Sequence, residues 1–126
     1  MKKTLTVGIA RYEDMKARTM AIARGEHRPS KDEPTIWFTS LESLAKILSA
    51  RNQALLELIA DRKPASLAEL EALSGRAKSN LSRTLRTMER YGLVQLSQGE
   101  RHRIVPRVPY SRIRFEMPLH SAEADA

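Results

Sequence analysis

Residues 65–94 hold the pattern that most constrains the fold of this chain: two short amphipathic helices separated by a tight turn. Ser66 can cap the first helix, which we expect to end near Gly75, because glycine adopts a positive φ without steric cost. The second helix is expected at about 77–91, before Gly92. Its apolar residues recur at the spacing of one buried helix face: Ala77, Leu81, Leu85 and Met88.

The other face of this second helix is polar and cationic. It carries Lys78, Ser79, Asn80, Ser82, Arg83 and Arg86. A helix in a DNA major groove needs such side chains, because Asn80 can pair bidentately with adenine and Arg83 with guanine. Arg86 and Arg90 lie later on the helix and suit phosphate. An ordinary solvated face is the alternative, but acidic residues are missing from this face until Glu89.

The basic charge is concentrated in the same part of the chain. With 22 Lys and Arg against 15 Asp and Glu, the formal net charge is +7. Residues 76–107 contain eight basic and two acidic side chains, a net charge of +6. A generic solubilising surface would spread this excess. The block therefore favours a polyanionic partner, namely DNA, RNA or an acidic protein surface.

Several functional classes are disfavoured by the sequence. The chain has no cysteine, which excludes disulfides and thiolate metal sites and favours the cytoplasm. Its N-terminus lacks the apolar region of a signal peptide, and no apolar run has the length of a membrane span. The three histidines have no partners at metal-ligand spacing, and no catalytic motif is present. We therefore expect a cytoplasmic protein that is not an enzyme and has no metal or cofactor.

The residues before this helix pair are expected to form a βα extension and two more helices. The patterns predict strands at 4–10 and 35–38, and helices at 11–24, 40–48 and 53–62. Thr39 with Glu42, and Ser66 with Glu69, have the spacing of capping boxes. Residues 49–52 are expected to break or bend the chain between two of the helices.

A β-hairpin is expected after the helix pair, at 93–108, followed by a last strand at 110–117 and a tail at 118–126. Gly99 is the predicted turn residue. Arg101 and Arg103 would share one face of the second strand, where they could contact the DNA backbone or minor groove. A merely solvated hairpin is the alternative. Arg76 and Arg107 are further candidate phosphate contacts.

The order helix, helix, helix, hairpin over 53–108 is the layout of a winged helix-turn-helix. The run AKSNLSRTLRTMERYGLVQL resembles the recognition helix and first wing strand of MarR-type regulators, and ALLELIADRKPASLAELEALSG resembles their two preceding helices. The whole chain also resembles a group of small prokaryotic predicted transcriptional regulators, some of them toxin-linked. It lacks the long terminal dimerisation helices of MarR proteins, so their ligand pocket is not carried over.

We therefore predict an α+β fold with three parts. A winged helix-turn-helix domain, with a three-helix core and a β-hairpin wing, is expected at 50–117. A βα extension at 1–49 would be the dimerisation or partner surface, and 118–126 a flexible tail. The expected DNA contacts are Arg76, Lys78, Ser79, Asn80, Ser82, Arg83, Arg86 and Arg90 on the recognition helix, and Gln98, Arg101, His102 and Arg103 on the wing.

Three functions are compatible with these patterns. The first is a sequence-specific double-stranded DNA-binding transcription regulator, acting as a homodimeric repressor on a palindromic operator. Its dimer surface is expected on the N-terminal strand and helix, with Trp37 and Phe38 nearby. The second is an antitoxin that binds a partner toxin and autoregulates its operon. The third is an RNA-binding or ribosome-associated module, which the scarcity of aromatic side chains disfavours for single strands.

Overall fold

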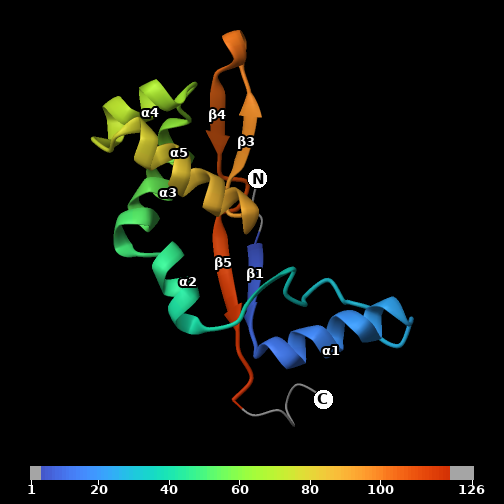
Figure 1. Ribbon diagram of the computed structural model, residues 1–126. Helices are drawn as coiled ribbons and strands as arrows, with labels where there is room; N and C mark the ends of the chain where they lie inside the picture. Colours follow the sequence, from blue (N-terminus) through green and yellow to red (C-terminus); the bar gives the residue numbers. More distant parts are fainter. Residues whose placement is uncertain (1–3, 120–126) are drawn as a thin grey trace. The chain divides into compact units, whose positions relative to one another are not determined.

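The computed structural model describes residues 4–119 and has the mixed α+β composition that the sequence predicts (Figure 1). The chain forms two compact units. The helical unit comprises residues 46–111, and the sheet unit comprises residues 4–45 together with 112–119. The division falls between residues 45 and 46, where the sequence suggested 49 and 50. Most of the tail expected at 118–126 lies outside the described residues.

The sheet unit contains a three-stranded parallel sheet. Its strands are β1 (Thr4–Ile9), β2 (Ile36–Phe38) and β5 (Arg112–Glu116), in the order β2-β1-β5. Val7 of β1 lies opposite Ile36 on one side and Phe115 on the other. Because β1 is central, every residue from Leu5 to Ile9 is buried. Apolar residues from three separate segments of the chain thus lie together on one face of the sheet.

The position of β5 differs from the prediction. The last strand was expected at 110–117, within the winged helix-turn-helix residues 50–117. In the structure it pairs with β1, more than a hundred residues away along the chain. Parallel pairing requires a long crossover connection, and the helical unit lies within that connection. Alternation along residues 112–116 identifies a strand, but it does not identify the partner strand.

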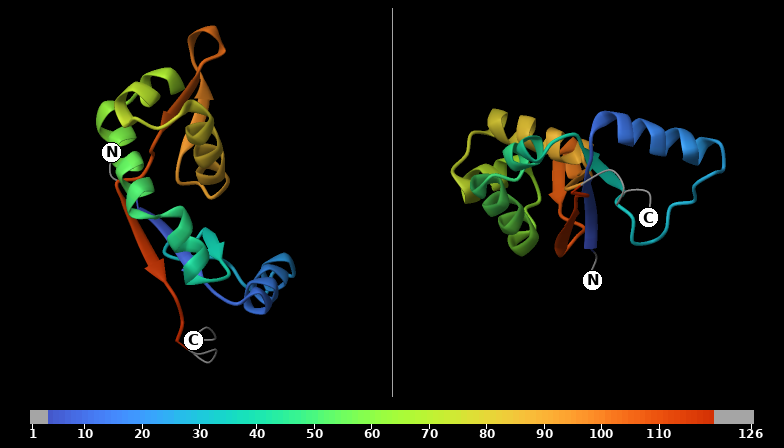
Figure 2. Two further views of the ribbon diagram at one scale, coloured as in Figure 1. Left: turned by 60° about the vertical axis from the view of Figure 1, so that its left-hand side comes forward. Right: turned by 90° about the horizontal axis from the view of Figure 1, so that it is seen from below.

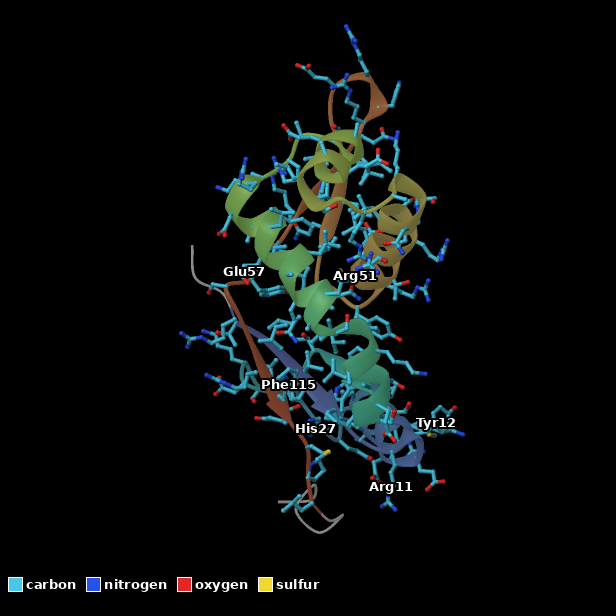
Figure 3. The ribbon with its side chains drawn as sticks, turned by 90° about the vertical axis from the view of Figure 1, so that its left-hand side faces the viewer. Arg11, Tyr12, His27, Arg51, Glu57 and Phe115 are labelled. Atoms are coloured by element: carbon cyan, nitrogen blue, oxygen red, sulfur yellow. The ribbon has the colours of Figure 1, made fainter. Side chains whose placement is uncertain are left out.

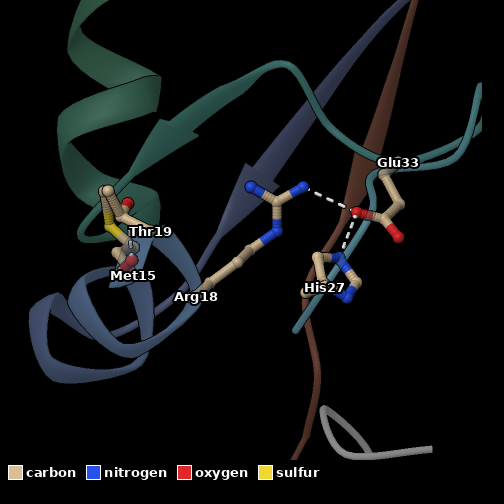
Figure 4. A network of polar contacts seen from close by, with 5 residues as sticks. All are labelled: Met15, Arg18, Thr19, His27 and Glu33. Atoms are coloured by element: carbon tan, nitrogen blue, oxygen red, sulfur yellow. Dashed lines mark hydrogen bonds and ion pairs between the residues drawn. The ribbon is translucent and has the colours of Figure 1, made fainter. Parts of the chain in front are cut away.

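Helix α1 (Tyr12–Ala23) has no buried residue, and polar and cation–π contacts join it to the rest of the sheet unit. The Trp37 ring lies over Gly8, where a Cβ atom would come within 2.5 Å of it. The Arg18 guanidinium lies 5.2 Å from the centre of this ring. Arg18 Nη2 also donates a 2.6 Å hydrogen bond to Glu33 Oε2, and His27 Nε2 lies 3.0 Å from the same oxygen (Figure 4). This network joins α1 to the connection that precedes β2.

The helical unit contains three α-helices and a hairpin, whose turn includes a short 3-10 segment at Glu100–His102 (Figure 2). The chain reaches it through α2 (Leu41–Ile47). Its elements are α3 (Ala50–Arg62), α4 (Leu67–Ser74), α5 (Lys78–Arg90), and the antiparallel strands β3 (Gln95–Gln98) and β4 (Ile104–Arg107). The core is aliphatic and consists of Leu55, Ile59, Leu67, Leu70, Leu81, Leu85, Met88, Leu93 and Val94. The predicted buried face of α5 is confirmed except for Ala77, which is its exposed N-cap residue.

Side-chain caps set the starts of the other helices of this part of the chain. Ser66 Oγ accepts a 3.1 Å hydrogen bond from Glu69 N, so the predicted Ser66 cap is confirmed. The Glu69 carboxylate accepts a hydrogen bond from Ala65 N, one residue before the position that a capping box requires. The box predicted at Thr39 and Glu42 is wrong. Because α2 begins at Leu41, the cap falls to Ser40, whose Oγ accepts from Ser43 N at 3.1 Å. The expected break at 49–52 is the Ser49 cap of α3.

We predict that acid weakens the sheet unit through Glu33. Hydrogen bonds from His27 and Arg18 lower the pKa of Glu33 to about 2. A carboxyl group with a lowered pKa binds fewer protons in the folded state than in the unfolded state. Its contribution is therefore present above the ordinary carboxyl pKa of about 4.3 and is lost as the pH falls toward about 2.

The Glu33→Gln substitution should lower the free energy of unfolding at pH 7, and this loss should shrink between about pH 5 and pH 2. Urea denaturation across this range measures the effect. Glu13→Gln is the matched control, because it removes an exposed carboxylate of α1 that takes no part in the network. A loss for Glu33→Gln that stays constant with pH would contradict the prediction.

Candidate nucleic-acid interface

Helix α5 has two chemically distinct faces. Leu81, Leu85 and Met88 are completely buried on one of them. The predicted contact residues lie on the other, where Lys78, Ser79, Arg83, Arg86 and Arg90 are exposed and Asn80 and Ser82 are half-buried. The face is therefore cationic and rich in hydrogen-bond donors.

The three-residue connection from α4 to α5 fixes where this face begins. Helix α4 packs against α5, and Gly75 ends α4 with a φ of +74°. Ala77, the N-cap residue of α5, has no side chain that could accept a hydrogen bond. Glu71 of α4 supplies the acceptor instead, because its Oε2 receives a 3.2 Å hydrogen bond from Lys78 N. A carboxylate also suits the positive end of the helix dipole.

Arg76 has a different role from the one predicted. Its residue is only 8% exposed, and burial lowers the pKa of its guanidinium. The guanidinium donates hydrogen bonds to Asn80 Oδ1 at 2.9 Å, Asn52 Oδ1 at 3.0 Å and Thr84 Oγ1 at 3.2 Å. Arg76 therefore joins α3 to α5 and is not free to contact a phosphate. It is a positioning residue.

The hydrogen bond from Arg76 limits how Asn80 can pair with a base. Bidentate pairing with adenine needs both the oxygen and the nitrogen of the amide. Because Asn80 Oδ1 already accepts from Arg76 Nε, that pairing would have to share or break this bond. Exposed Lys78, Ser79 and Arg83 are the freer groups in the first half of the helix.

Arg107 is also held by the protein. Its Nη1 atom lies 2.7 Å from the carbonyl oxygens of both Pro64 and Pro106 and donates to them. This contact joins β4 to the connection between α3 and α4. The guanidinium is thus engaged within the helical unit, and the expected phosphate contact is not supported by its position.

The tip of the hairpin is exposed but differs from the prediction. Gln98, Arg101, His102 and Arg103 are all exposed. Arg101 and Arg103 were expected on one face of a strand, but β4 begins only at Ile104. Arg101 and His102 instead lie in the turn, with φ values of 57° and 61°. The turn is closed by Gly99 N donating to Arg103 O at 2.7 Å and Arg103 N donating to Glu100 O at 3.1 Å.

Arg51 is a further basic residue of the helical unit, and it is not among the contact residues expected from the sequence. It lies exposed in the first turn of α3 (Figure 3), and its positive charge adds to the effect of burial in lowering the pKa of Arg76. No spacing rule relates it to α5, because the two helices meet only in the folded structure. Asn52, the partner of Arg76 on α3, was missed for the same reason.

Residues 4–119 contain neither a candidate membrane span nor a cluster of candidate metal ligands. No helix in this range combines the length and apolar character needed to cross a membrane. Within the same range, no three or more His, Cys, Asp or Glu side chains gather as metal ligands would.

We predict that Arg76 stabilises the helical unit. Arg76→Ala should lower the free energy of unfolding by about 2–4 kcal/mol, because it removes three hydrogen bonds and leaves their half-buried acceptors on Asn52, Asn80 and Thr84 without this donor. Arg83→Ala removes the same charge from an exposed site on α5 and should change stability by less than about 0.5 kcal/mol. Chemical denaturation measures both variants. Equal, small effects would show that the Arg76 network is not stabilising.

Residues 47–115 match the model of the HVO_A0114 family. The matched range covers more than half of the chain and includes α3, α4, α5, the hairpin and most of β5. All candidate contact residues lie within it. No curated protein and no solved structure matches the chain.

Proposed function

The chain belongs to the HVO_A0114 family, a family of unknown function, and we propose that it is a sequence-specific double-stranded DNA-binding transcription regulator. In this proposal, α3, α4 and α5 with the β3–β4 hairpin form a winged helix-turn-helix. Helix α5 is the recognition helix and the hairpin is the wing. The observation that carries the proposal is the exposed face of α5, which bears lysine, arginine and hydroxyl side chains and no carboxylate before Glu89.

The form of this face suits a major groove. Lys78, Ser79 and Arg83 occupy the first half of α5, the part of a recognition helix that reaches base edges. Arg86 and Arg90 follow one and two turns after Arg83 and suit the phosphate backbone. The exposed tip of the wing would add contacts to the backbone or the minor groove.

The charge that remains available also supports a nucleic-acid partner. Of the eight basic residues between 76 and 107, Arg76 and Arg107 are engaged within the protein. The other six are exposed on α5 and at the tip of the hairpin: Lys78, Arg83, Arg86, Arg90, Arg101 and Arg103. Exposed cations on a recognition helix and a wing give the salt-dependent affinity typical of duplex binding.

Duplex DNA fits this surface better than single-stranded RNA. Recognition of single strands relies on aromatic side chains that stack on the bases. The helical unit contains only two aromatic residues, Tyr91 and Tyr110, and both are half-buried. Toxin neutralisation, the alternative raised by the sequence, remains a prediction. Helix α1, which has no buried residue, is the element that could supply the surface for such a partner.

We predict that Arg83 reads a base. Selection from a random duplex pool should enrich one sequence, and Arg83→Ala should weaken binding to that sequence by roughly 1–3 kcal/mol while relaxing the preference at one position. Fluorescence anisotropy at fixed salt measures both effects. Arg28→Ala is the control, because it removes an exposed arginine from the sheet unit. A pool without enrichment, or equal losses on selected and random DNA, would contradict base reading.

We predict that Arg101 on the wing contacts phosphate. Arg101→Ala should weaken binding to selected and random duplexes alike, because the backbone is the same in both. The slope of log affinity against log salt concentration should fall in magnitude by about 1. Titrations at several salt concentrations measure the slope, with Arg28→Ala again as control. An unchanged slope would show that Arg101 does not contact a phosphate.

A further inference from the structure

Strand β5 leaves one edge of the sheet open. β1 covers one side of it, and no strand within residues 4–119 pairs with the other side. Large apolar side chains are exposed on and just after this strand: Phe115 is 53% exposed and Met117 is 48% exposed. Figure 3 labels Phe115 on the strand. An open edge with unpaired backbone groups and exposed apolar side chains is a template for another strand.

We propose that this edge binds β5 of a second copy of the chain. The two strands run antiparallel about a twofold axis that passes through Phe115, so that two three-stranded sheets become one. A twofold contact of this kind is self-complementary, because the same strand lies on both sides. The alternation of polar and apolar residues along β5 allows the register of this pairing to be derived.

The faces of the sheet limit the possible registers. Ile113 and Phe115 lie on the face shared with Leu5 and Val7 of β1, both of which are buried. Directly opposite residues of antiparallel strands point to the same face, and a slip of one residue would turn every apolar side chain to the other face. The twofold axis must therefore pass through a residue and cannot pass between two.

The charged residues of β5 then decide through which residue of the strand the twofold axis passes. An axis at Arg112, Arg114 or Glu116 places each of these charges opposite its own copy. An axis at Ile113 places Arg112 opposite Arg114. Only an axis at Phe115 avoids like charges, because it places Arg114 opposite Glu116 and Ile113 opposite Met117, with the two Phe115 rings side by side. Opposite charges and apolar pairs in these positions stabilise antiparallel strands.

This surface differs from the one expected from the sequence, which comprises the N-terminal strand and helix near Trp37 and Phe38. Strand β1 is the central strand and Phe38 is buried, so neither is accessible to a second copy. The proposal does not depend on DNA binding, because it follows from the edge of the sheet alone. A strand of five residues buries less area than the roughly 1,200–2,000 Å² of a standard interface, so we expect a dimer that forms in the micromolar range.

Charge-swap variants of the full chain test the register. Arg114→Glu alone and Glu116→Arg alone should each weaken the dimer roughly tenfold, because each places like charges opposite one another twice. The double variant should restore the wild-type affinity. Arg112→Glu is the control, because Arg112 has no charged residue opposite it in this register. Sedimentation equilibrium without DNA measures the dimer dissociation constant, and circular dichroism verifies folding.

A single cysteine provides an independent test, since the chain contains none. Only residue 115 lies opposite its own copy, so Phe115→Cys should form a disulfide-linked dimer under mild oxidation. Arg112→Cys should not, because its two copies lie about 20 Å apart in this register. The proposal would be overturned if the wild-type chain stayed monomeric at high micromolar concentration. It would also be overturned if the charge swaps neither weakened nor restored the dimer, or if residue 112 crosslinked in preference to residue 115. Because DNA is absent from both tests, they are independent of base reading by Arg83.

Discussion

The hydrogen bonds of Arg76 are the interaction on which the candidate interface depends. A buried guanidinium is unfavourable unless its donors are satisfied, and here they are satisfied by Asn52 of α3 and by Asn80 and Thr84 of α5. The apolar face of α5 provides packing that depends little on direction. Hydrogen bonds depend strongly on direction, so the Arg76 network fixes how α5 is rotated against α3. It thereby fixes which side chains of α5 are exposed.

The features that could be predicted from the sequence are those set by neighbours along the chain. The burial of Leu81, Leu85 and Met88 follows from helical spacing, and the Ser66 cap follows from the position of Glu69. The exposed cationic face of α5 follows from the same spacing. Each of these features depends on residues that lie within one or two helical turns of each other. Periodicity in the sequence reports on interactions over this range.

The features that could not be predicted depend on residues far apart in the sequence. In the sequence, nothing distinguishes Arg76 from an exposed basic residue after a turn. One of the hydrogen-bond partners that its buried guanidinium needs is Asn52, 24 positions away. The alternation along β5 identifies a strand that follows the hairpin in the sequence, but its partner β1 lies at the other end of the chain. The conformation of Arg101 is set by closure of the hairpin turn, which requires positive φ at two residues that are not glycine.

The chain path also bears on how two copies could act on one DNA molecule. Phe115 lies eight residues after Arg107, the last residue of β4. Eight residues span at most about 29 Å, so an axis through Phe115 keeps the ends of the two wings within roughly 60 Å of each other. Half-sites one helical turn apart lie about 34–36 Å from each other, which is within this limit. For the proposed dimer, the length of this connection is therefore compatible with two copies of the proposed recognition helix on adjacent half-sites.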